Sequence, residues 1–217
     1  MKRAFTLMEL VLVIVVIGII SAVMVPRMNN VQIDKAAQQV LAHIRYTQHL
    51  AMMDNQFDPT DSNWFKKRWQ IRFQTKHSHI VYTIYKDQDA DGAGSPELIQ
   101  DTIATNPQNI NQKLTGRDDA TNSGAYNKKM DLTKTYNIKA VSFSHCIGSK
   151  RIYFDYMGRA MAGDPASLDR QYYEENHNKN YLIQNECKVT LTDENNNKAT
   201  ITIEPETGYA YISKIER

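Results

Sequence analysis

The chain has 217 residues, and its 26 Lys and Arg against 24 Asp and Glu give a formal net charge of +2. A hydrophobic fraction of 41% is ordinary for a folded protein and excludes a disordered chain, and nine Gly with six Pro exclude a collagen-like repeat. The balanced charge provides no long-range attraction to nucleic acid or to acidic partners.

An apolar run opens the chain. Residues 10–25 carry no charge, and the span 5–25 carries one, Glu9. As a helix this span would be about 32 Å long, which is enough to cross the hydrocarbon core of a bilayer. Lys2 and Arg3 precede the span and favour a cytoplasmic N-terminus, with the rest of the chain outside. The sequence therefore predicts a transmembrane helix over 5–25.

A secretory signal peptide is the competing interpretation of this run. The basic start fits a signal peptide, but the apolar region is long and is interrupted near its beginning by Glu9. A carboxylate at the centre of a membrane helix costs about 2.5–3.5 kcal/mol on insertion scales. Glu9 is therefore expected to have a partner, which favours a retained helix.

The segment MKRAFTLMELVLVIVVIGII closely resembles the start of type IV prepilins and type II secretion pseudopilins. The resemblance implies a cytoplasmic leader, residues 1–4, that prepilin peptidase removes by cutting between Ala4 and Phe5, and N-methylation of Phe5. Glu9 becomes the fifth residue of the mature chain, where it pairs with the Phe5 amine of a neighbouring subunit and sets the register of assembly. The family usually has Gly before the cut, and here the small residue is Ala4.

Apolar residues continue at helical spacing after the span, so residues 26–56 are predicted to be an amphipathic, periplasmic continuation of the helix. Pro26 stands where family members often carry a helix-kinking proline, and we expect a kink there. Two separate helices hinged at Pro26 are the alternative. Pro59 and the turn-forming residues of 55–63 end the helix.

Strand patterns dominate the predicted globular domain, residues 64–217. Alternating polar and apolar residues predict a hairpin of 69–75 with 79–85 and a single strand over 151–158 that ends at Gly158. They also predict a terminal antiparallel meander of 187–193, 198–204 and 209–215. Two polar stretches, 104–136 and 162–186, are predicted to be loops, the second with one helical turn. The predicted fold class is α+β and pilin-like: a long N-terminal helix, membrane-spanning in its first half, packed on a C-terminal antiparallel β-sheet domain.

Two short segments resemble H-type minor pseudopilins. One is IYFDYMGRAMAG at 152–163, and the other is ITIEPETGYAYI at 201–212. Ordinary turn chemistry of Asp155, Gly158 and Gly208 is the alternative explanation for both.

A second candidate site is the acidic segment DQDADG at 87–92. Asp87, Asp89 and Asp91 stand on alternate residues before Gly92, a pattern that converges oxygen ligands on calcium. It departs from an EF-hand, because position 12 is Leu98 and no helices flank the loop. A solvated acidic loop is the alternative, so calcium is a predicted but not a required cofactor.

Cys146 and Cys187 are the only cysteines. In an extracytoplasmic compartment two cysteines usually pair. Both are predicted to lie at strand starts, so we expect a cross-strand disulfide between them.

The chain shows no P-loop, nucleophile elbow or zinc-hydrolase signature, so we do not expect an enzyme. The basic segment WFKKRW at 64–69 is interpreted as a connector, and no nucleic acid is expected. The resemblance implies a minor pseudopilin of a type II secretion system, single-pass in the bacterial inner membrane with its globular domain in the periplasm. The implied partners are other pilin-like subunits, the prepilin peptidase and methylase, and the inner-membrane assembly platform.

Two alternatives remain open from the sequence. A minor pilin of a type IV pilus or competence system would share the same leader and Glu9. A membrane-tethered calcium-binding module that does not polymerise would not need Glu9.

Overall fold

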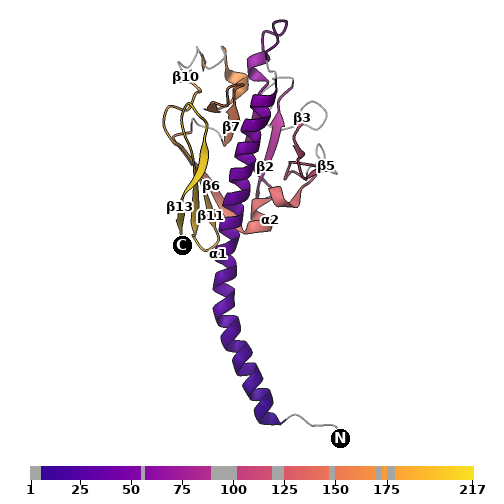
Figure 1. Cartoon of the computed structure of the whole chain (residues 1–217), viewed down its shortest axis with the longest axis vertical. Helices are drawn as coiled ribbons and strands as arrows, with labels where there is room; N and C mark the ends of the chain where they lie inside the picture. Colours follow the sequence, from indigo (N-terminus) through magenta and orange to yellow (C-terminus); the bar gives the residue numbers. More distant parts are fainter. Residues whose placement is uncertain are drawn as a thin grey trace.

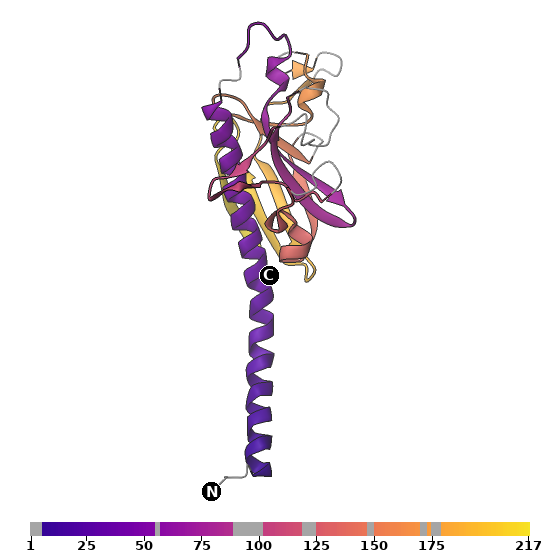
Figure 2. The same ribbon diagram turned by 90° about the vertical axis from the view of Figure 1, so that its right-hand side faces the viewer.

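A computed structural model of the chain describes residues 6–54, 57–88, 102–118, 125–146, 150–169, 173–174 and 179–217, with the backbone alone at 22–31, 173–174 and 179. The chain is one helix with a β-rich domain built around its C-terminal half, while the N-terminal half projects away from that domain (Figure 1; Figure 2).

Helix α1 (Leu7–Met53) has 47 residues and is the first element. It is a single helix, so the alternative of two helices separated at Pro26 is not what the backbone shows. Asp54 ends it in an extended conformation and ties it to the domain. The Asp54 carboxylate accepts hydrogen bonds from Trp69 Nε1 at 3.0 Å and Lys86 Nζ at 2.7 Å.

The first main sheet contains the predicted hairpin, which is confirmed. A short 3-10 turn, η1 (Trp64–Lys66), leads into β1 (Trp69–Lys76), which pairs antiparallel with β2 (His79–Lys86). The other strands are β3 (Thr102–Ile103), β7 (Arg151–Phe154) and β8 (Ala160–Ala162), and the order is β3-β2-β1-β7-β8.

The second main sheet contains the predicted terminal meander, which is also confirmed. Strands β11 (Cys187–Asp193), β12 (Lys198–Ile203) and β13 (Ala210–Glu216) pair antiparallel in turn. A fourth strand, β6 (Ile138–Ser144), lies beside β11 and was not predicted.

Smaller elements fill the two stretches that were predicted to be loops. The first holds the ribbon of β4 (Thr105–Asn106) and β5 (Asn109–Lys113), then η3 (Lys128–Met130) and α2 (Leu132–Tyr136). The second holds η4 (Pro165–Ser167), the one helical turn that was expected, and the ribbon of β9 (Tyr173–Glu174) and β10 (Lys179–Asn180).

The core lies between the C-terminal half of α1 and both main sheets. The fully buried residues of α1 fall at helical spacing and are small or β-branched; within the described side chains they are Ile33, Ala36, Ala37, Val40, Ile44, Thr47 and Ala51. Small side chains let strands from both sheets approach the helix closely. The rings of Phe73 in β1 and Phe143 in β6 meet edge to face at 5.6 Å, which joins the two sheets.

The predicted fold class is wrong in two respects. The strands do not form one sheet but a five-stranded sheet, a four-stranded sheet and two small ribbons. The predicted membrane-spanning first half is not found either: among the described residues no helix is long and apolar enough to cross a membrane.

Three finer predictions are also corrected. Cys146 follows the end of β6 and does not begin a strand, because the backbone has already left the β11 ladder there. The strand predicted over 151–158 stops at Phe154, because Asp155 and Gly158 form a turn. The stretch 104–136 is not simply a loop, since Leu114, Met130 and other apolar residues in it are buried in the core.

The two segments that resemble H-type minor pseudopilins meet on α1. Gln48 Nε2 donates to Gly158 O at 2.8 Å and to Thr207 O at 2.9 Å, so one side chain holds a turn from each segment. Asp155, which is fully buried, organises the first turn by accepting from Met157 N and Arg159 N. This is the turn chemistry that the sequence offered as an alternative explanation.

Candidate assembly surface

The projecting end of α1 is an exposed apolar surface. Of residues 7–21, all except Glu9, Gly18 and Ser21 are large apolar side chains that are exposed, from 43% at Val11 to 80% at Leu7. They surround the helix instead of forming one stripe, and a helix that is apolar on all sides is normally buried. Burying each such side chain is worth about 1.5–3 kcal/mol, so this segment has a strong drive toward other apolar surface.

Ser21 does not interrupt this surface. Its hydroxyl donates to Ile17 O at 2.8 Å, which satisfies the polar group within the helix. Gly18 leaves open space at the position of a Cβ atom. A second helix can therefore approach the backbone of α1 more closely at Gly18 than elsewhere in this segment.

Glu9 stands in the first turn of α1 and forms a reciprocal capping box with Thr6. Glu9 N donates to Thr6 Oγ1 at 3.3 Å, and Glu9 Oε2 accepts from Thr6 N at 3.0 Å and Thr6 Oγ1 at 3.1 Å. The carboxylate thus satisfies an N–H at the helix start and lies at the positive end of the helix dipole. Among the described residues, both bonds that the carboxylate accepts end on Oε2, and a carboxylate can accept further hydrogen bonds.

Thr6 was missed in the sequence analysis. Its signal was present, because Thr-x-x-Glu directly before an apolar run is the pattern of a capping box. Ala4 and Phe5, the predicted cleavage position, lie outside the described residues. Pro26 lies within α1, but its side chain is outside the described part, so the predicted kink at that proline stays a prediction.

The calcium prediction falls largely outside the described residues. Asp87 follows β2 and is 5% exposed, whereas Asp89 and Asp91 are not described. Within the described ranges no group of three His, Cys, Asp or Glu side chains is arranged to hold a metal ion.

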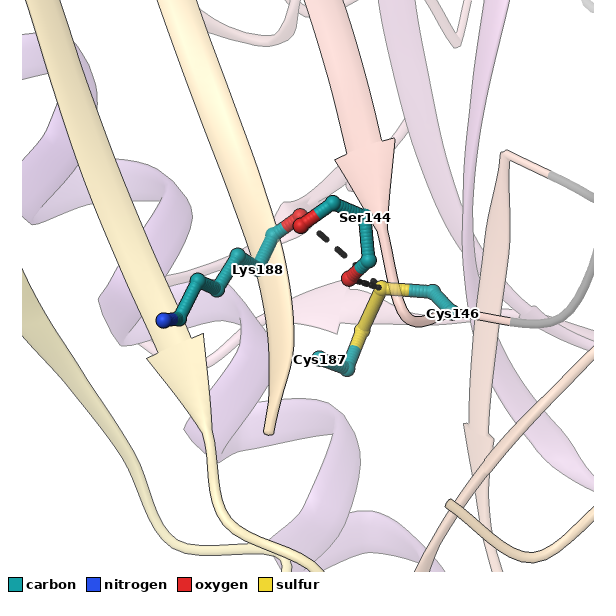
Figure 3. Close-up of a disulfide and its surroundings, with 4 residues drawn as sticks. All are labelled: Ser144, Cys146, Cys187 and Lys188. Carbon is teal, nitrogen blue, oxygen red and sulfur yellow. Dashed lines mark hydrogen bonds between the residues drawn. A yellow bond between two sulfur atoms is a disulfide. The ribbon is translucent and has the colours of Figure 1, made fainter. Parts of the chain in front are cut away.

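The predicted disulfide between Cys146 and Cys187 is confirmed (Figure 3). The two Cα atoms are 4.9 Å apart, and both cysteines are buried. The disulfide closes the ladder of β6 and β11 next to the pair Ser144 and Lys188. Cys146 Sγ lies 3.3 Å from Ser144 O. This contact is not a hydrogen bond, because a sulfur in a disulfide has no hydrogen to donate.

A polar groove, which no sequence pattern predicted, lies between α1 and the β4–β5 and α2 region. It has a volume of about 490 Å³, and His43, Gln39 and Tyr136 are among its lining residues. Beneath it, the fully buried Tyr82 hydroxyl lies 2.7 Å from His43 Nδ1 and accepts from Gln39 Nε2 at 3.0 Å. Tyr136 completes the network by donating to Gln39 Oε1 at 2.6 Å.

Burial lowers the pKa of His43 from 6.5 to about 4. Between those values the unfolded chain binds a proton and the folded chain does not, so stability should fall as the pH drops from 6.5 toward 4, by up to about 1.4 kcal/mol per pH unit. His43→Gln should remove this part of the pH dependence, as measured by urea unfolding from pH 7.5 to 4. His49→Gln, at an exposed position of the same helix, is the control and should follow the parent.

No family model, curated protein or solved structure matches this chain. The assignment of a function therefore depends on the chain's own residues.

Proposed function

We propose that this protein is a structural subunit, of the minor pseudopilin kind, that assembles into a periplasmic pseudopilus of a type II secretion system through the N-terminal part of α1. The observation that carries the proposal is the exposed apolar surface of residues 7–21, which projects clear of the folded domain (Figure 2). A monomer in water would leave this surface exposed, and in a filament it is covered by the same segments of neighbouring subunits.

The resemblance of the first twenty residues to prepilins supports the same proposal and adds the processing steps. Prepilin peptidase cuts between Ala4 and Phe5, and methylation follows on the new amine. In this proposal the chain lies at the bacterial inner membrane with its globular domain in the periplasm, where an assembly platform transfers it to the growing filament. A disulfide between Cys146 and Cys187 suits that oxidising compartment.

Glu9 has two roles in this proposal, and they can be separated. Within one chain it caps α1 through Thr6. Between chains its charge neutralises the Phe5 amine of a neighbour, in surroundings that the apolar side chains keep dry. A buried charge that loses its partner costs about 3–5 kcal/mol, so loss of the carboxylate charge should reduce assembly by a factor of ~100 or more.

Glu9→Gln is the informative variant, because Gln at this position still forms a capping box but carries no charge. It should fold and enter the membrane fraction like the parent, and it should fail to assemble. Assembly is measured as adducts with other pilin-like subunits, using a photo-crosslinking amino acid in place of Ile14. Glu9→Leu should fail in the same way.

Thr6→Ala is the matched control, because it weakens the cap and keeps the charge. It should retain most of the adducts, since losing an N-cap costs only about 1 kcal/mol of helix stability. Adducts at the parental level in Glu9→Gln would contradict the proposal and would leave Glu9 with its capping role alone.

A further inference from the structure

The face of the first sheet that points away from α1 carries a small hydrophobic cluster, in which Tyr153 packs with Met161, and several polar side chains beside it. Ile71 and Phe73 of β1, and Ile152 of β7, belong to the core beneath α1. Side chains alternate along a strand, so Gln70 and Arg72 in β1, with Arg151 and Tyr153 in β7, lie on the opposite face. We call this set the back face.

Arg72 and Arg151 are directly opposite each other in the antiparallel pairing of β1 with β7. Like charges at directly opposite positions destabilise a sheet. Burial and then the charge of Arg151 hold the pKa of Arg72 below its ordinary value. Asp164 Oδ1 accepts from Arg151 Nη1 at 2.7 Å and offsets one of the two charges.

Buried polar atoms without partners gather on the back face. Within the described part of the chain no hydrogen-bond partner is found for five of them: Gln70 Oε1, Gln70 Nε2, Arg72 Nη1, Arg151 Nε and Tyr153 Oη. Gln70 and Tyr153 are fully buried, and Arg151 is 4% exposed. Most buried hydrogen-bond donors and acceptors in proteins have a partner. A group of unsatisfied polar atoms on one face therefore indicates a bound ligand or ordered water there.

A pocket opens beside the two arginines. It has a volume of about 330 Å³, and its lining includes Arg72, Lys150 and Arg151 together with the polar side chains Gln74 and Thr75. The described lining includes no Asp or Glu. Three cations, less the charge that Asp164 offsets, leave a net charge of +2, which matches a dianion better than a single carboxylate.

We propose that the pocket lined by Arg72, Lys150 and Arg151 binds a phosphate group. The guanidinium groups supply forked donors that suit tetrahedral oxyanions, and Lys150 supplies a point charge. The bound dianion accepts hydrogen bonds from the side chains that line the pocket and offsets the repulsion between Arg72 and Arg151 across β1 and β7. The pocket is larger than a phosphate ion, so the group can belong to a larger molecule.

The test measures thermal unfolding of the full chain in a non-ionic detergent, with millimolar sodium phosphate against sodium chloride at equal ionic strength. Phosphate should raise the Tm of the parent by at least ~2 °C. Sodium acetate should have a smaller effect. Glycerol phosphate distinguishes a free phosphate ion from a phosphate attached to a larger molecule. A larger rise in Tm than with inorganic phosphate indicates an attached phosphate, such as a lipid headgroup, and an equal rise indicates free phosphate. Either result supports the site.

Arg72→Gln should raise the Tm without phosphate, because it removes one of two facing charges, and should lose the phosphate response. Lys150→Gln is a second variant that should not disturb folding, because Lys150 is exposed and its hydrogen bond with Phe73 N is made by its backbone oxygen, which the substitution keeps. Its phosphate response should fall. Lys198→Gln, an exposed lysine on the other sheet, should respond like the parent.

The proposal is overturned if phosphate has no effect on the parent beyond that of chloride, because the pocket then does not hold a dianion. It is also overturned if Arg72→Gln and Lys150→Gln respond as strongly as the parent. An acetate effect equal to that of phosphate would exclude the preference for a dianion.

Discussion

Replacing Cys146 and Cys187 together by alanine should lower the free energy of unfolding by about 4 kcal/mol, the chain-entropy value for a closed loop of this size. The two cysteines are separated by 41 positions. The loop between them contains β7 and β8, which belong to the first sheet, while its ends lie beside β6 and β11 in the second. Without the disulfide, the unfolded chain gains conformational entropy, because the ends of this loop are no longer held together. Folding must then order a loop whose strands belong to both sheets.

The loss should appear as a Tm lower by about 8–16 °C for a chain of this length. Urea unfolding of the full chain in detergent provides the free energy directly. Reducing the parent with dithiothreitol should reproduce the loss, whereas the double variant should not respond to the reductant. A double variant within about 1 kcal/mol of the parent would mean that the pairing of β6 with β11 already holds the loop ends together.

Gly208→Ala should destabilise the folded chain by about 3 kcal/mol. Gly208 has a φ of +65°, where an alanine is strained by roughly 1–2 kcal/mol. A Cβ atom there would lie 2.3 Å from Gly158 O and 2.8 Å from Gln48 Nε2, so the backbone must move, at about 1–3 kcal/mol. The movement separates the two turns that Gln48 holds against α1.

Gly18→Ala is the matched control for that substitution. A Cβ atom at Gly18 meets nothing within 4 Å, and the residue lies in the part of α1 that projects beyond the domain. The midpoint of urea unfolding should therefore match that of the parent. A midpoint for Gly208→Ala that also matches the parent would show that the two turns can separate without cost, and that their contact on α1 does not support the fold.

The local sequence pattern was sufficient to predict several strands of the fold. Residues 187–193 alternate between polar and apolar side chains, and turn-forming residues separate them from the predicted strand 198–204, so the strand type follows from the sequence, while the observed β12 ends one residue earlier, at Ile203. The hairpin of β1 and β2 was equally accessible, because two alternating segments flank a short polar turn. The capping box of Thr6 and Glu9 was also encoded locally, although it was overlooked.

Contacts between residues far apart in the sequence explain why strand β6 and the buried residues of 104–136 were not predicted. Strand β6 has mostly exposed and half-buried residues, so its sequence carries a weak signal, and it becomes a strand by pairing with β11 more than forty residues later. Residues 104–136 are polar on average, yet Leu114, Met130 and Leu132 turn inward and complete the core next to α1. Average composition hides a few inward-facing side chains.

By itself the sequence determined the apolar helix near the start of the chain, the meander and the partnership of two cysteines, because each depends on neighbouring residues or on a count. Only the tertiary structure decided that the strands divide between two main sheets, that Gln48 joins two distant turns, and that Arg72 stands opposite Arg151. Those arrangements depend on which strand lies beside which, and strand order is chosen by the packing of the whole core around α1. A residue's local sequence carries no information about a neighbour eighty positions away.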